Sequence, residues 1–176
     1  MNAFEVFGVE PSVVVDGEWL SGRYRELAAE KHPDAGGDKE RFEEIGKAHD
    51  VLKSVSGCAR HFMEVRGITY DARGSVGDEL MDLFMEVGGV LQRVDGFVRK
   101  KEKAASALAK ALLEGESMEM QELLEVTQEK VEGERDLLIV RLREGVADGD
   151  LAELVRDLAF LEKWQVQLRG RYGSLF

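Results

Sequence analysis

The sequence predicts an all-α protein, with a helical hairpin near the N-terminus followed by an antiparallel three-helix bundle. Apolar residues recur every three or four positions along almost the whole chain of 176 residues, which is the spacing of amphipathic helices. The one cluster of β-branched residues, at 13–15, is too short to found a sheet. Both prolines, Pro11 and Pro33, fall in the first third of the chain and indicate breaks between helices there.

The N-terminal third is expected to contain three helices. A short helix near residues 4–7 is stopped by Gly8, a residue that readily ends helices. Asp16 and Asp38 are expected to cap the second and third helices by accepting hydrogen bonds from their first free N–H groups. The stretch KHPDAGGD at 31–38 joins these two helices by a short turn. The two helices should therefore pack antiparallel, apolar stripe against apolar stripe.

The remainder of the chain is expected to form longer helices. Turn-forming residues at 71–78 predict a domain boundary there and divide the chain into domains of residues 1–72 and 73–176. An apolar three–four alternation then starts at Leu80. The stretch EGES is read as a break, with Ser117 capping the next helix, and a turn near Gly149 precedes the last one. Three long amphipathic helices joined by tight turns favour an antiparallel bundle.

The composition excludes several classes of protein. The formal charge of -11 repels nucleic acid and anionic membrane, so neither is expected as a partner, although a local basic patch is compatible with it. No run of eighteen apolar residues predicts a membrane span, and the N-terminal residues do not resemble a signal peptide. The single cysteine, Cys58, has no partner for an internal disulfide. A reducing, cytoplasmic location fits it.

The tripeptide HPD at 32–34 is the strongest motif. Alone it is a weak signal, since a surface turn with a proline and a histidine has no particular function. Its setting adds information, because YREL precedes it and RFEEIGKAHDVL follows it, and this arrangement resembles a J-domain. FEVFGV, VD at 15–16, LSGRYREL, KHPD, MEVRG and VRDLAFLEKW are similar to HscB, the J-type co-chaperone of iron–sulfur cluster assembly. The likeness is weak between residues 85 and 145.

The resemblance implies a specific function. Such proteins stimulate the ATPase of a DnaK/HscA-type chaperone and deliver to it an IscU-type iron–sulfur scaffold protein. It implies that His32, Pro33 and Asp34 dock on the ATPase, that no cofactor is needed and that the protein is not an enzyme. The physics of the turn agrees, since proline fixes one backbone angle and Asp34 can accept charge-assisted bonds from a partner's arginine.

Basic residues of the second helix are expected to strengthen that docking. Arg25 lies away from the apolar stripe, and Arg23 and Lys31 lie nearer its edges. Glu26 and Glu30 stand where this class is often basic, which predicts weaker or more selective electrostatic steering. The alternative is an ordinary solvated helix face.

A client-binding surface is expected on the second domain. Phe160 points away from the apolar stripe of the last helix and stands where the family has a client-contacting phenylalanine. Met81 and Met85 leave the stripe of the first bundle helix in the same way, and methionine suits an adaptable surface. The full predicted patch is Leu80, Met81, Phe84, Met85 and Phe160. The alternative is that these are single exposed apolar residues, which are common.

Other functions are less well supported by the sequence. His49, Cys58 and His61 do not have the spacing of a zinc site, and no nucleophile stands beside a plausible base. Two alternatives stay open: a J-domain adaptor that tethers the chaperone to a different client, and a helical interaction protein with a degenerate J-like domain. The segment MEVGGVLQ departs from the acidic, arginine-bearing run usual in the family, which leaves the identity of the client open. Self-association is open as well.

Overall fold

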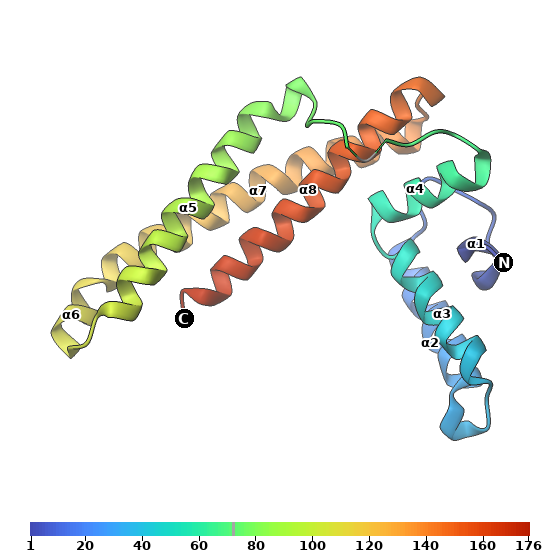
Figure 1. Ribbon diagram of the computed structural model, residues 1–176, viewed down its shortest axis with the longest axis horizontal. Helices are drawn as coiled ribbons and strands as arrows, with labels where there is room; N and C mark the ends of the chain where they lie inside the picture. Colours follow the sequence, from blue (N-terminus) through green and yellow to red (C-terminus); the bar gives the residue numbers. More distant parts are fainter. Residues whose placement is uncertain (72) are drawn as a thin grey trace. The chain divides into compact units, whose positions relative to one another are not determined.

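The computed structural model describes residues 1–71 and 73–176. No strand occurs among these described residues, which confirms the predicted all-α class. The elements, in chain order (Figure 1), are α1 (Ala3–Phe7), α2 (Gly17–Lys31), the 3-10 turn η1 (Pro33–Ala35), α3 (Lys39–Leu52), α4 (Val55–Arg66), the 3-10 turn η2 (Asp78–Leu80), α5 (Met81–Lys103), α6 (Ala107–Leu112), α7 (Glu114–Glu144) and α8 (Asp148–Ser174).

Contacts within the chain divide it into two compact units. The first comprises Met1–Gly74 and Leu138–Ala159, and the second comprises Ser75–Leu137 and Phe160–Phe176. Helices α7 and α8 therefore contribute residues to both units. The predicted boundary between residues 72 and 73 involves Ala72, which lies outside the described residues, and that boundary stays a prediction.

In the first unit, α2 and α3 form the predicted antiparallel hairpin, with residues 32–38 at its tip (Figure 1). The side chain of Asp16 accepts from the N–H of Trp19 at 2.7 Å, and that of Asp38 accepts from the N–H of Glu40 at 2.9 Å. Gly8 ends α1 in the left-handed conformation, with φ of 68°. All three helix boundaries are those predicted from the local sequence.

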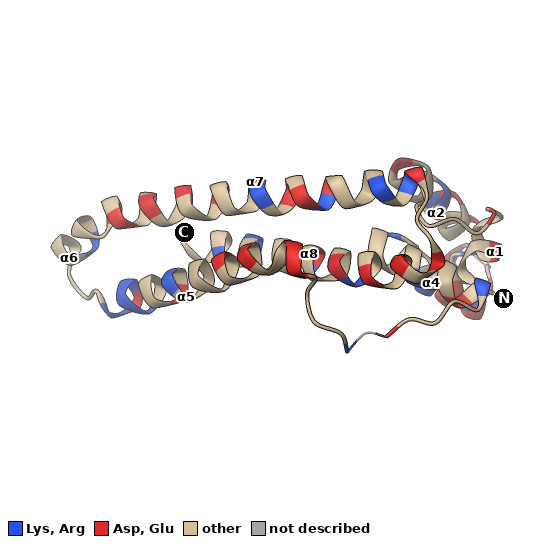
Figure 2. Ribbon diagram, turned by 90° about the horizontal axis from the view of Figure 1, so that it is seen from above, with Lys and Arg blue, Asp and Glu red and all other residues tan. Residues whose placement is uncertain are grey.

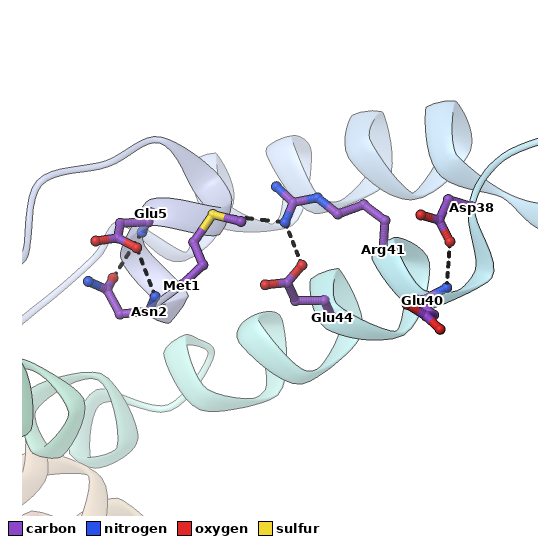
Figure 3. A network of polar contacts seen from close by, with 7 residues as sticks. All are labelled: Met1, Asn2, Glu5, Asp38, Glu40, Arg41 and Glu44. Atoms are coloured by element: carbon purple, nitrogen blue, oxygen red, sulfur yellow. Dashed lines mark hydrogen bonds and ion pairs between the residues drawn. The ribbon is translucent and has the colours of Figure 1, made fainter.

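Helix α1 packs on α3 and completes the core of the hairpin. Figure 3 shows that Met1 lies beside this helix, with its sulfur 3.9 Å from the guanidinium of Arg41. Asn2 and Glu5 form a capping box at the start of α1, which satisfies two of its free N–H groups. The buried residues of this core are Ala3, Phe4, Val6, Phe7, Leu20, Ile45, Ala48, Leu52 and Cys58.

The histidines considered for a metal site have other partners. The ring of His49 stacks on Tyr24 with centroids 4.2 Å apart, and burial, followed by the nearby charge of Lys53, lowers its pKa. The Nε2 atom of His61 accepts from the N–H of Ala3 at 3.0 Å. Within the described ranges, no group of three or more histidine, cysteine or carboxylate side chains is placed to hold a metal ion.

The thiol of Cys58 should be unreactive in the folded protein. It is 1% exposed, and burial raises its pKa from an ordinary value of 9.0 to about 11. An alkylating reagent at pH 8 should therefore modify it only after unfolding, because the thiolate is the reacting form. Equal labelling rates in folded and urea-unfolded protein would contradict this.

The same shift predicts a loss of stability at alkaline pH. The unfolded thiol ionises near 9, while the folded one keeps its proton until about 11. As far as this thiol is concerned, the protein therefore keeps its full stability below pH 9, where the thiol is protonated in both states. As the pH rises to 11, the free energy of unfolding falls by up to about 3 kcal/mol. Urea titrations at these two pH values measure it, and a Cys58→Ala variant should show a smaller loss.

The second unit is a helical bundle built from α5, most of α7 and the end of α8. Glu86 of α5 lies 2.7 Å from Lys130 of α7, and Lys100, later in α5, pairs with Glu116, earlier in α7. These two helices therefore run antiparallel. The ion pairs that join α8 to α5 and α7 are Arg171–Asp95 and Arg169–Glu132.

Apolar residues from all three helices fill this bundle, and charged residues recur along the length of α7 (Figure 2). The buried residues are Val87, Val90, Val94 and Phe97 of α5, Met120, Leu124 and Val131 of α7, and Leu161, Trp164 and Leu168 of α8. None of the described helices combines the length and the apolar character that crossing a bilayer needs.

One predicted helix start is wrong. Ser117 does not cap a helix, because its N–H donates to the carbonyl of Leu113 at 2.8 Å and α7 already begins at Glu114. The break lies earlier, at residues 104–106, where Ser106 accepts from the N–H of Ala109 at 3.1 Å and caps α6. Local capping chemistry fits either serine, and only the folded chain distinguishes between them.

Candidate functional site

The tip of the hairpin holds the HPD tripeptide in a single 3-10 turn. Helix α2 ends at Lys31, and His32 then has an extended conformation, with φ of -62° and ψ of 130°. This is the conformation that a following proline favours. Pro33 starts the turn, and Nδ1 of His32 accepts from the N–H of Asp34 at 3.2 Å. The imidazole therefore caps the turn that presents it.

The two glycines that follow are required for different reasons. Gly36 has φ of 81°, a conformation that residues with a Cβ rarely adopt. Gly37 has an ordinary φ, but a Cβ there would lie 2.3 Å from the carbonyl carbon and oxygen of Lys31. The N–H of Gly37 also donates to the carbonyl of His32 at 3.0 Å. Close approach of two backbone segments at Gly37 closes the turn.

Substituting Gly37 by alanine should destabilise the hairpin more than substituting Gly36. The clash at Gly37 is with backbone, which cannot rotate away, so we expect a loss of about 3 kcal/mol. Gly36→Ala should cost about 1 kcal/mol, because only left-handed strain opposes it.

Urea unfolding measures both losses. Gly22→Ala is the matched control, because Gly22 lies within α2 with nothing within 4 Å of an added Cβ. It should gain about 1 kcal/mol of stability. A Gly37→Ala variant as stable as the unaltered chain would contradict the close approach.

The side chains of His32 and Asp34 are exposed to solvent. Their exposed fractions are 46% and 92%, and Oδ2 of Asp34 lies 3.7 Å from Nδ1 of His32. The edge of the imidazole packs against the ring of Phe42, with centroids 5.2 Å apart. Since Nδ1 accepts a hydrogen bond, the neutral ring carries its proton on Nε2. The turn therefore offers one N–H donor and one carboxylate at fixed positions.

The three basic residues of α2 are partly neutralised. Arg23 lies 3.0 Å from Glu26, and Lys31 lies 2.6 Å from Glu30. The Nε of Arg25 donates to the carbonyl of Ser21 at 3.2 Å, and this side chain is exposed. Two of the three cations predicted to face a chaperone thus have a carboxylate partner on their own helix.

Four of the five predicted client-binding residues are accessible. Met81, Phe84 and Met85 expose 39%, 41% and 66% of their surface, and Phe160 is partly buried. Leu80 differs, because it ends the turn η2 and is only 3% exposed. The prediction that Leu80 contacts a client therefore needs correction: its side chain is part of the core and has no free surface to offer.

The structure adds Trp164, which is not among the predicted residues, to this patch. Its ring centroid lies 5.8 Å from that of Phe84 and 6.1 Å from that of Phe160. Trp164 is only 4% exposed, so it is a buried residue that packs beneath the two phenylalanine rings. Its position four residues after Phe160, on the same side of α8, was the available signal.

The glycine pair of α5 has no packing explanation. Gly88 and Gly89 are exposed within a continuous helix, and nothing lies within 4 Å of a Cβ added to either. They follow Met85 by three and four residues, so they continue its exposed face. A close contact with another described residue of the chain therefore does not explain the two glycines.

An HPD turn at the tip of an antiparallel helical hairpin is the arrangement that the resemblance to J-domain proteins leads us to expect. No protein-family model matches the chain. A DnaJ protein homolog from Allium porrum is 47% identical over 49 residues, which are 28% of this chain and 11% of that protein. An HscB co-chaperone homolog from Vibrio vulnificus is 32% identical over 77 residues, 39% of this chain and 45% of that protein. The chain thus matches less than half the length of either relative.

Two further comparisons cover the whole chain. An HscB co-chaperone homolog from Aeromonas hydrophila is 25% identical over 188 residues, which include 100% of this chain and 99% of that protein. The solved structure of HscB from Vibrio cholerae has a TM-score of 0.64 and 21% identity, covers both chains completely and supports the fold. The chain therefore resembles HscB-type J-domain co-chaperones along its full length, which confirms the predicted resemblance and extends it to residues 85–145, where the likeness seen in the sequence was weak.

Proposed function

We propose that the chain is a J-domain co-chaperone that stimulates ATP hydrolysis by a DnaK/HscA-type chaperone. The observation that carries this proposal is the exposed HPD turn, in which backbone contacts fix the imidazole while Asp34 is 92% exposed. A rigid turn loses little conformational entropy on docking. Steady-state ATP hydrolysis by a DnaK-type chaperone, with and without the chain, tests it.

The proposed mechanism requires no catalytic group on this chain. An arginine of the ATPase donates two charge-assisted bonds to the carboxylate of Asp34, and an oxygen acceptor receives the Nε2–H of His32. Stimulation follows if the ATPase offers these groups together only in its hydrolysis-competent state, because a ligand shifts an equilibrium by its differential affinity. The chain acts in this proposal as a non-enzymatic adaptor in the cytoplasm.

Client delivery is the second part of the proposal. Met81, Phe84, Met85 and Phe160, with Trp164 beneath the two phenylalanines, form the surface that binds an IscU-type iron–sulfur scaffold protein. Exposed methionines adapt to a partner's shape, and aromatic residues contribute strongly to protein interfaces. Similarity to HscB homologs over the full chain supports this assignment.

A second candidate function differs only in the client. Gly88 and Gly89 stand beside Met85 where the resemblance leads us to expect an acidic, arginine-bearing run, and this favours an adaptor that tethers the chaperone to another protein. Titration of the chain with an IscU-type scaffold distinguishes the two candidates. Saturable binding supports iron–sulfur delivery, and its absence in a chain that still stimulates the ATPase supports the other client.

A further inference from the structure

One end of the second unit exposes apolar side chains that no other described part of the chain covers. Helix α6 lies across the ends of α5 and α7 (Figure 1), and none of its residues is buried. Leu108 and Leu112, one helical turn apart, expose 72% and 75% of their surface, and Met118 at the start of α7 exposes 69%. Isolated exposed leucines are common, but neighbouring ones on one face indicate an interaction surface.

Cations surround this apolar face on an otherwise acidic chain. Residues 99–110 contain five Lys or Arg and one Glu, whereas the whole chain has a formal charge of -11. Figure 2 shows the basic residues on α5 next to α6. Arg99, Lys103 and Lys110 are exposed and form no ion pair within the described part of the chain. They are therefore free to meet an anionic partner.

We propose that this end of the bundle docks on an anionic lipid bilayer. Leu108 and Leu112 enter the boundary between headgroups and acyl chains, and Arg99, Lys103 and Lys110 contact the anionic headgroups. Apolar side chains flanked by lysine and arginine are the chemistry of interfacial helices. The overall charge predicted no membrane partner, but residues 99–110, with five Lys or Arg and one Glu, are locally positive.

The shape of the surface favours a bilayer over an acidic protein. Leu108 and Leu112 project from a helix at the end of the bundle, and no described groove contains them. The hollow beside α6 is lined by Lys101 and Lys110 but also by Glu102 and Glu114. This hollow therefore has no continuous positive lining for an acidic peptide. The exposed face with Leu108 and Leu112 fits the flat surface of a lipid bilayer better.

The acidic remainder of the chain need not prevent this docking. Helix α7 has 31 residues, a length of about 47 Å at 1.5 Å per residue. Exposed charges are screened over about 8 Å at physiological ionic strength. The carboxylates of the far half of α7 therefore act weakly on a membrane at its first residues.

Vesicle sedimentation of the full chain tests the proposal. Vesicles of phosphatidylcholine alone are compared with vesicles that also contain phosphatidylglycerol, at low and at physiological salt. The chain should bind the anionic vesicles at least about tenfold more strongly than the neutral ones, and salt should weaken this binding. Leu108→Ser with Leu112→Ser should lower it at least about tenfold, and so should Lys103→Glu with Lys110→Glu.

Val166→Ser is the matched control, because Val166 is 70% exposed on α8 and lies outside the proposed surface. Its binding should equal that of the unaltered chain. A second readout uses Leu112→Cys labelled with an environment-sensitive fluorophore, since Cys58 is buried and should stay unlabelled. Its emission should shift to the blue on anionic vesicles only.

Three results would overturn the proposal. The first is no sedimentation with anionic vesicles at low salt, and the second is binding that the leucine substitutions leave unchanged. The third is binding to polyglutamate without binding to vesicles, which would assign the surface to an acidic polypeptide.

Discussion

Replacing His32 by glutamine should reduce the stimulation of ATP hydrolysis by a DnaK-type chaperone at least about tenfold. Glutamine lacks the ring that packs against Phe42 and the Nδ1 that accepts from the N–H of Asp34. Its amide N–H groups lack these two contacts, so they are not held at the position of the imidazole Nε2–H. We expect stimulation to fall at least about tenfold, the equivalent of one good hydrogen bond of about 1.4 kcal/mol. Single-turnover and steady-state ATPase assays measure the loss.

The control for this experiment is Lys39→Gln. Lys39 begins α3 near the turn and its side chain is 78% exposed, so this change removes a charge close to the site and leaves the turn intact. Stimulation of the chaperone's ATPase by the Lys39→Gln variant should stay within about twofold of that by the unaltered chain, because exposed ion pairs contribute little. If the His32→Gln protein unfolds at the same temperature and still stimulates fully, the J-domain function proposed above is wrong.

Substituting Phe84 and Phe160 together by alanine should weaken binding of an IscU-type scaffold at least about thirtyfold, since central aromatic residues of interfaces contribute 2 kcal/mol or more. Both rings lie within about 6 Å of Trp164 by centroid distance, so the substitutions remove the two aromatic groups that Trp164 supports. Isothermal titration measures the affinity. ATPase stimulation by the chain alone should not change, because Phe84 and Phe160 are far in sequence from the HPD turn and belong to the other compact unit.

Leu137→Ala is the control for scaffold binding, because Leu137 is an exposed residue of α7, 60% accessible, and is not part of the patch. Scaffold affinity that the phenylalanine substitutions leave unchanged would place the client elsewhere on the chain. No measurable scaffold affinity in the unaltered chain would favour the second candidate function.

Local chemistry made the hairpin predictable from the sequence. Asp16, Gly8 and Asp38 each act through atoms within a few residues, so their neighbours alone specify the helix ends. The exposure of His32 is what its place in a short turn at the tip of the hairpin leads us to expect. The same logic misplaced the cap at Ser117, because two serines stand near the break and only Ser106 lies outside the helix.

The candidate client surface was only partly predictable, because it depends on contacts between segments distant in sequence. Leu80 shares a helical stripe with Phe84, but the turn η2 directs it into the core. Trp164 reads as another core residue of α8, and only the position of α5 reveals that it lies beneath Phe84. Burial of this kind is a property of the packed unit and cannot be read from one helix.

The two exposed glycines of α5 leave a short length of helix backbone bare. Each disfavours the helix by about 1 kcal/mol relative to alanine, and no contact with the described residues compensates for it. Because neither glycine has a side chain, the surface of α5 is lower at these two residues than at the neighbouring Met85. An aromatic side chain of a partner protein can pack against the backbone there, closer to the helix axis than it can where α5 carries side chains. The partner's sequence should therefore have a large residue at the position that meets Gly88 and Gly89.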